Sequence, residues 1–149
     1  MAELQEMPAI DIDSREMKMW GEHWLSDKNT ETSNSKERNS FDRQQSVNFA
    51  SFIDLSFGKA ISKMLGGIEV VTPTGNSLLP AKPDIVEVGP VRIVGGVRPQ
   101  NFDAAYRPDG PRIVFDSKTL NEEKSIGKNW QNMINDLGTE ATTVHTRFP

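Results

Sequence analysis

The chain has 149 residues, of which 36% are hydrophobic and 7% aromatic, and its formal net charge is −4. This length suits a single domain, the absence of cysteine excludes disulfides and cysteine-based zinc sites, and the acidic balance excludes a basic field over the whole molecule. No stretch approaches the roughly 20 apolar residues of a membrane span and no signal peptide opens the chain, so we expect a cytoplasmic protein without a membrane partner.

The first 46 residues are expected to form a polar, largely disordered leader and linker. Residues 26–46 contain one large apolar residue, Phe41, which is too little apolar surface to offset the entropy lost on ordering. Residues 1–25 place two tryptophans among charged residues, a pattern that fits a short amphipathic helix or a partly ordered leader. The folded domain is therefore predicted to span residues 47–149.

This domain begins with the best-defined helix of the sequence. From Asn48, apolar residues recur every three to four positions, and Gly66-Gly67 ends the run. Residues 68–72 then predict a strand. Beyond a loop rich in proline and glycine, residues 84–88 and 91–97 predict a pair of strands with a Gly-Pro break between them.

A hairpin is predicted over residues 101–118, "NFDAAYRPDGPRIVFDSK". Its centre, residues 107–110, has the Pro-Asp-Gly order of a tight turn. With that turn, Asp103 and Asp116 lie diagonally across the two strands, with backbones about 7–8 Å apart. Because side chains alternate along a strand, Lys118 shares the face of both aspartates.

Two carboxylates at a strand end repel each other unless a positive charge lies between them. Mg²⁺, with Mn²⁺ as a substitute, prefers oxygen ligands, lowers the pKa of its bound water and polarises a phosphoryl oxygen. A lysine beside such an ion can hold or help deprotonate the water and can stabilise a charged phosphate. Asp103, Asp116 and Lys118 are therefore the candidate catalytic residues for phosphodiester hydrolysis.

A second helix is predicted after the hairpin, beginning at Asn121 and continuing to about Ala141. Residues 142–149 then turn strand-like, and the chain stops at Pro149. The predicted fold class is α/β, with a mixed sheet flanked by helices.

Asp103, a hairpin and then Asp116-Ser117-Lys118 resemble the signature of the PD-(D/E)xK nuclease superfamily, the restriction-endonuclease-like fold. The family core of helix, three strands, helix and strand is similar to the predicted order, and the resemblance covers residues 47–149. It implies that Asp103, Asp116 and the backbone carbonyl of Ser117 bind the metal, while Lys118 positions or activates the attacking water. Phe102 stands where the family name has proline, a departure that leaves the chemistry intact.

Further residues are candidates for supporting roles. Asp54 on the first helix and Glu69 at the start of the next strand could supply a third acid, although a solvated charge is the alternative for each. Because the net charge of the chain is negative, nucleic-acid contacts must come from a local basic or polar patch. The alternative is that the same residues are ordinary arginines on exposed strand edges or part of a solvent-exposed helix face. The candidates for this patch are Arg98, Arg107, Lys124, Lys128 and Gln131.

The expected function is that of a Mg²⁺-dependent DNA endonuclease domain, of a restriction or defence system. The alternative is a non-catalytic nucleic-acid-binding or interaction module that keeps the nuclease fold, and the choice of DNA over RNA stays open. The resembled fold has a strand after its second helix, which residues 142–149 would only begin. We therefore expect a truncated chain of low activity, with an open sheet edge for a partner strand. A homodimer is compatible with the resemblance.

Overall fold

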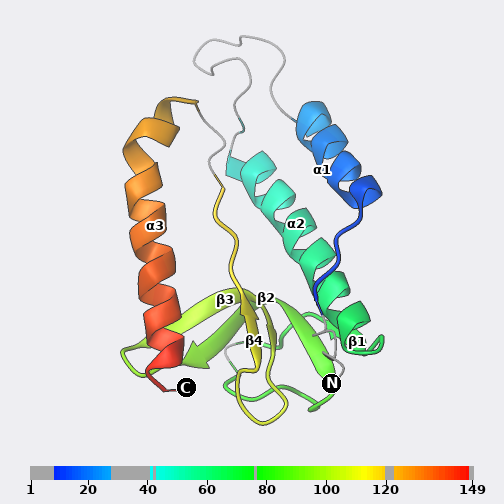
Figure 1. The fold of residues 1–149 in the computed structure, drawn as a ribbon, viewed down its shortest axis with the longest axis vertical. Coiled ribbons are helices and arrows are strands. Elements are labelled where there is room, and N and C mark those ends of the chain that lie inside the picture. Colours follow the sequence, from blue (N-terminus) through cyan, green and yellow to red (C-terminus); the bar gives the residue numbers. More distant parts are fainter. Residues whose placement is uncertain (1–8, 28–40, 42, 76, 120–122, 148–149) are drawn as a thin grey trace, which may run out of the picture.

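The structure is a computed structural model of the chain, and it describes residues 9–27, 41, 43–75, 77–119 and 123–147. Within these ranges, three helices and one four-stranded sheet form the fold (Figure 1). The elements in chain order are α1 (Ser14–Asp27), α2 (Arg43–Met64), β1 (Glu69–Val71), β2 (Ile85–Val94), β3 (Pro99–Tyr106), β4 (Ile113–Phe115) and α3 (Glu123–His145). Within these residues, no helix combines the length and the apolar character that a membrane crossing needs.

The sheet is mixed, which confirms the predicted fold class at the level of α/β. Its strand order is β1-β2-β3-β4. β1 runs parallel to β2, whereas β2 with β3 and β3 with β4 are antiparallel. The finer expectation of a restriction-endonuclease-like core stays a prediction.

β2 is one ten-residue strand, so the prediction of two strands in this region is wrong. The pairing of β2 with β3 shifts register between Val88 and Val91, and Gly89 has a φ of 125°. A β-bulge of this kind accepts a glycine with positive φ and a proline without an N–H group. The Gly-Pro pair therefore bends β2 and does not end it.

The N-terminal region contains a helix that packs onto the domain. Asp13 caps α1, because its Oδ1 accepts hydrogen bonds from the backbone amides of Arg15 and Glu16 at 2.7 and 2.9 Å. Trp20 stacks on Phe57 of α2, with ring centroids 5.7 Å apart. The domain boundary expected at residues 46 and 47 falls inside α2, and residues 28–40 and 42 of the expected linker lie outside the described residues.

The core lies on both faces of the sheet. One cluster joins residues of β2 and β3, with Val114 of β4 and Val144 of α3 packed against it. On the opposite face Phe115 of β4 stacks on Phe57 of α2, with ring centroids 4.2 Å apart. Because Val114 and Phe115 are neighbours on one strand, they point to opposite faces. The end of α3 and the length of α2 therefore cover different sides of β4.

The predicted strand over residues 142–149 is wrong for the part that the structure describes, because α3 continues to His145. The amide of Gly96 donates a hydrogen bond to the carbonyl of Thr143 at 2.9 Å, which holds this end of the helix against the turn between β2 and β3. A side chain at Gly95 would lie 2.3 Å from Thr143 Cγ2, so the contact needs glycine. Tertiary docking overrides the β propensity of the Thr-Thr-Val sequence.

Candidate functional site

The register of β3 and β4 places Asp103 and Asp116 at the same level of the sheet. Ala104 pairs with Phe115, so the next position along the ladder sets Asp103 opposite Asp116. The diagonal placement predicted from the sequence is wrong by two residues, because the chain reverses over a longer loop that the amide of Arg112 closes on the carbonyl of Tyr106 at 2.9 Å. A shift of two residues keeps side chains on the same face, so the expected convergence of the two aspartates survives.

Ser117 connects two acidic side chains from different elements. Its backbone amide donates a hydrogen bond to Asp103 Oδ2 at 2.7 Å. Its hydroxyl lies 2.8 Å from Asp54 Oδ1 and 3.0 Å from Asp103 Oδ2, and one proton serves these two acceptors. Asp54, which is 8% exposed on α2, is therefore part of the cluster and is not the solvated charge that the sequence left as an alternative.

Lys118 connects two further carboxylates. Its ammonium group pairs with Asp116 Oδ2 and, at 3.0 Å, with Glu140 Oε1 of α3. Glu140 was missing from the residues chosen by sequence, although one signal could have found it. It follows Met133 and Leu137 at helical spacing, so it is a charged residue within the apolar stripe of α3.

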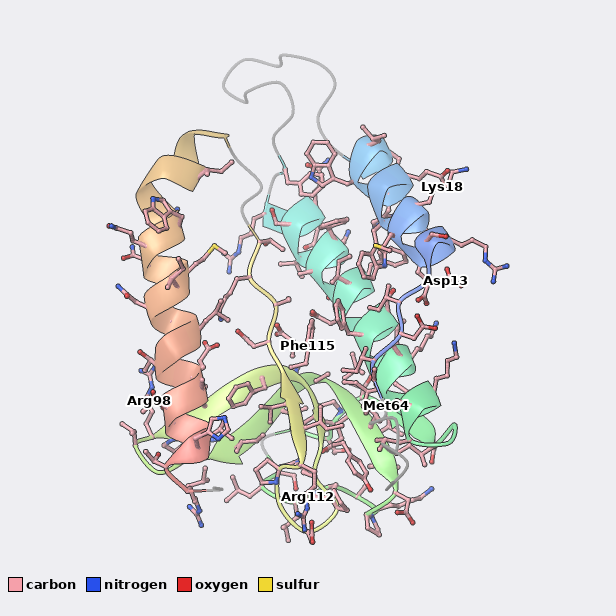
Figure 2. All side chains as sticks on the ribbon, viewed as in Figure 1. Asp13, Lys18, Met64, Arg98, Arg112 and Phe115 are labelled. Carbon is pink, nitrogen blue, oxygen red and sulfur yellow. The ribbon has the colours of Figure 1, made fainter. Side chains whose placement is uncertain are left out.

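These five residues, Asp54, Asp103, Asp116, Lys118 and Glu140, are called here the acidic cluster; together with Ser117 they lie at the C-terminal end of β4. Figure 2 shows Phe115, which directly precedes Asp116, between the helices α2 and α3 and above the sheet. The cluster contains four carboxyl groups and one lysine, and the lysine pairs with two of them. The charge of the cluster is therefore strongly negative when all the carboxyls are ionised.

Burial, and after it the surplus of negative charge, raises the pKa values of two carboxyls in the cluster. Burial, with the nearby Glu140 and Asp103 carboxyls, raises the pKa of Asp116 to about 7 in spite of its pairing with Lys118. Burial and the charge of Asp103 raise the pKa of Asp54 to about 6, against the opposing effect of the Ser117 hydrogen bond. Burial alone would lower the pKa of Lys118, but its hydrogen bonds to Asp116 and Glu140 raise it overall. Lys118 is therefore protonated at neutral pH.

The donor chemistry of the cluster fits a hard divalent cation, because it offers carboxylate oxygens and excess negative charge. Glu140 Oε2 is buried and has no hydrogen-bond partner among the described residues. Within the same part of the chain, no three acidic or histidine side chains converge closely enough to surround one ion. Instead, Asp103 is engaged by Ser117 and Asp116 is engaged by Lys118.

The other residues chosen by sequence lie outside this cluster. Glu69 is exposed and pairs with Lys82 at 3.1 Å. Arg98, in the turn between β2 and β3, and Gln131, on α3, are exposed to solvent. The side chains of Lys124 and Lys128 are outside those that the structure describes.

Arg107 has a structural partner in the interior. Its Nε and Nη2 donate to the two carboxylate oxygens of Glu87 at 2.5 and 2.9 Å, and the two side chains are 3% and 4% exposed. Nη1 also donates to the carbonyl of Arg92 at 3.0 Å. A bidentate buried pair of this kind holds the end of β3 on β2, and a phosphate could not reach Arg107 without displacing it.

Comparison of the chain with protein-family models, with curated proteins and with solved structures gave no match.

Proposed function

We propose that the acidic cluster binds Mg²⁺ or Mn²⁺ and that the chain hydrolyses phosphodiester bonds of DNA. The observation that carries this proposal is the link that Ser117 makes between Asp54 and Asp103, with Asp116 paired to Lys118 on the neighbouring strand. The pKa values of Asp54 and Asp116 are raised towards neutrality. A cation or a bound proton is needed to offset their mutual repulsion. The resemblance of the Asp103 hairpin and Asp116-Ser117-Lys118 to the PD-(D/E)xK pattern supports the choice of a cation and of a phosphodiester substrate.

In this proposal Asp103, Asp116 and the carbonyl of Ser117 would hold the cation, with Asp54 as a neighbouring acid. The bound cation would lower the pKa of a water molecule and polarise a phosphoryl oxygen. Lys118, being protonated, donates hydrogen bonds and stabilises negative charge on the phosphate, so it positions the substrate and does not remove the proton from water. Glu140 is a positioning residue that holds Lys118 from the side of α3.

The alternative is a binding module that keeps this arrangement without cleaving. The observation that favours it is the engagement of Lys118 by two carboxylates and of Asp103 by Ser117, which leaves each group already partnered. A module of this kind would bind DNA, and its affinity would not depend on a divalent cation.

The test measures cation binding and cleavage in matched aspartate variants. Isothermal titration with Mg²⁺ and Mn²⁺ should show binding to the wild-type chain, no binding to Asp116→Ala, and unchanged binding to Asp109→Ala. Asp109 is the matched control because it is exposed at the hairpin turn and pairs with Arg112 at 2.6 Å, away from the cluster. Plasmid DNA should be nicked by the wild type and by Asp109→Ala only.

Two results would contradict the proposal. Equal Mg²⁺ binding by the wild type and Asp116→Ala would show that the cluster is not the cation site. DNA binding by the wild type without cleavage, at every concentration of Mg²⁺ and Mn²⁺, would establish the binding module.

A further inference from the structure

A cavity of about 350 Å³ lies next to Asp54, on the side of α2 that faces the sheet edge. Its walls include Asp54, Val70, Val71, Thr72, Val88 and Gly89. Asp54 belongs to this cavity and to the acidic cluster at once, because its Oδ1 accepts the hydrogen bond from Ser117. Ser117, which contacts both Asp54 and Asp103, therefore connects the cavity to the acidic cluster.

The cavity follows from how α2 meets the sheet. At Gly58 the helix lies so close to β2 that a β-carbon would be 2.1 Å from Val88 Cγ2. Figure 1 shows α2 rising from this end of the sheet, so the helix separates from the strands towards its N-terminus. Asp54 lies one turn before Gly58, and the bulge at Gly89 bends the facing strand. The space is built by the fold and not by a loop.

The chemistry of the cavity is asymmetric. The valine side chains from β1 and β2 give it an apolar wall. Asp54 gives it a carboxylate that is 8% exposed and whose one hydrogen bond from the described residues goes to Oδ1. A carboxylate only accepts hydrogen bonds, so Asp54 favours an occupant that donates one. The cavity thus suits a flat apolar ring with an N–H donor on its edge.

We propose that this cavity binds a nucleobase whose Watson–Crick edge carries an amino group, which donates to Asp54. The volume lies at the lower end of the range of about 300–1,000 Å³ for small-ligand pockets, a size for one base or nucleoside. A carboxylate only accepts hydrogen bonds, so it favours the amino groups of cytosine, adenine and guanine over the edge of thymine, where two carbonyls flank one N–H. This inference rests on the proposed function in one respect, namely that the base belongs to the strand that is cleaved.

Its place in that function is the positioning of the substrate. A base that has left the stack and entered this cavity would be anchored through Asp54, and Ser117 joins Asp54 to Asp103 of the cluster. The substrate class is therefore a single strand or a locally unpaired duplex, because a paired base cannot present its Watson–Crick edge.

The experiment measures nucleoside binding to the full chain in EDTA, so that it does not depend on a cation or on cleavage. Cytidine, thymidine and benzylamine are titrated by isothermal calorimetry or by chemical-shift changes. Thr72→Trp blocks the cavity, and Thr74→Trp is the matched control, because both threonines are exposed and only Thr72 is part of the cavity wall. Asp54→Asn tests the edge contact, since an amide both donates and accepts.

We expect the wild type to bind cytidine with a dissociation constant on the order of 0.1–1 mM, as a small fragment does. Thymidine should bind at least about fivefold more weakly, a difference of about 1 kcal/mol. Thr72→Trp should weaken cytidine binding about tenfold or more, while Thr74→Trp stays within about twofold. Asp54→Asn should bring the affinities for cytidine and thymidine together.

Three results would overturn the inference: no cytidine binding by the wild type, equal binding by the two tryptophan variants, or benzylamine binding as tight as that of cytidine. The last result would assign the cavity to organic amines in general. A chain that binds cytidine as expected but cleaves no DNA keeps the base site and refutes the proposed hydrolysis, so the two proposals are judged separately.

Discussion

The two helices beside the acidic cluster each contribute one carboxylate, but they are held in different ways. α2 packs on the sheet through its C-terminal half, where its buried residues run from Asp54 to Ser62. Among the described side chains of α3, only Glu140 and Thr143 are buried, and four apolar residues nearer its N-terminus are 42–57% exposed. These exposed residues are Ile126, Trp130, Ile134 and Leu137.

The two carboxylates therefore differ in how firmly the fold holds them. Asp54 is fixed by a helix whose packing is part of the main core, since Phe57 and Gly58, one turn further along, lie against β4 and β2. Glu140 is fixed by the last turns of a helix that meets the sheet mainly at the turn between β2 and β3. Damage to α2 should therefore affect the whole fold, whereas damage to α3 should affect only its own contribution to the site.

The largest expected effect comes from the residue that joins the two sides, Lys118. Lys118→Ala should lower DNA cleavage by about 10²-fold or more, the usual scale for losing a group that stabilises developing charge, while DNA affinity stays within a few-fold. The measurement compares cleavage rates with binding by fluorescence anisotropy. Equal losses of affinity and rate would make Lys118 a phosphate contact of a binding module.

A matched pair of glycine substitutions sharpens the comparison between the helices. Gly58→Ala places a methyl group into Val88, so it should lower the free energy of unfolding by about 1–3 kcal/mol. Gly138→Ala on α3 meets no atom within 4 Å and should raise that free energy by about 0.5–1 kcal/mol through helix propensity. Urea unfolding followed by tryptophan emission measures both. A destabilising Gly138→Ala would show that α3 packs more closely than the structure indicates.

A further effect concerns pH in metal-free buffer. The pKa values of Asp116 and Asp54 are raised to about 7 and about 6, so the folded chain binds more protons than the unfolded chain between their ordinary value of 3.8 and these values. This contribution to stability is fully present below about pH 4 and is lost as the pH rises through 6 and 7. Urea midpoints should therefore fall from pH 5 to pH 8.

A pair of aspartate variants controls for other titrating groups. Asp116→Asn should flatten the decline, because its carboxyl no longer titrates beside Lys118, Glu140 and Asp103. Asp109→Asn should leave the decline in place, since the hydrogen bond from Arg112 lowers the pKa of that exposed carboxyl. A decline of the same size in Asp116→Asn would mean that other groups cause it.

Local patterns predicted much of the fold. The apolar spacing from Asn48 and the glycines at residues 66 and 67 predicted most of α2, which ends at Met64. The alternation along the hairpin also predicted the shared face of Asp103 and Asp116. The exact register of β3 against β4 was not predicted. It depends on which backbone amide closes the loop, and the sequence pattern does not specify that amide.

Contacts between distant residues could not be predicted in the same way. Lys118 meets Glu140 only because α3 docks at Gly95 and Gly96, a contact that no local pattern contains. Glu87 and Arg107 are twenty residues apart, and their pairing in the interior, which involves a candidate phosphate ligand, is likewise absent from any local pattern.

The contact of α3 with Gly95 and Gly96 lies close to Glu140 and far from the first turn of the helix. Glu140 lies about 4.5 Å along the axis from Thr143, whereas Ile126 lies about 26 Å away, at 1.5 Å per residue. A tilt of about 10° around the glycines moves Ile126 by about 4 Å and Glu140 by less than about 1 Å. A tilt of this size therefore displaces the first turns of α3 several times further than the carboxylate that holds Lys118.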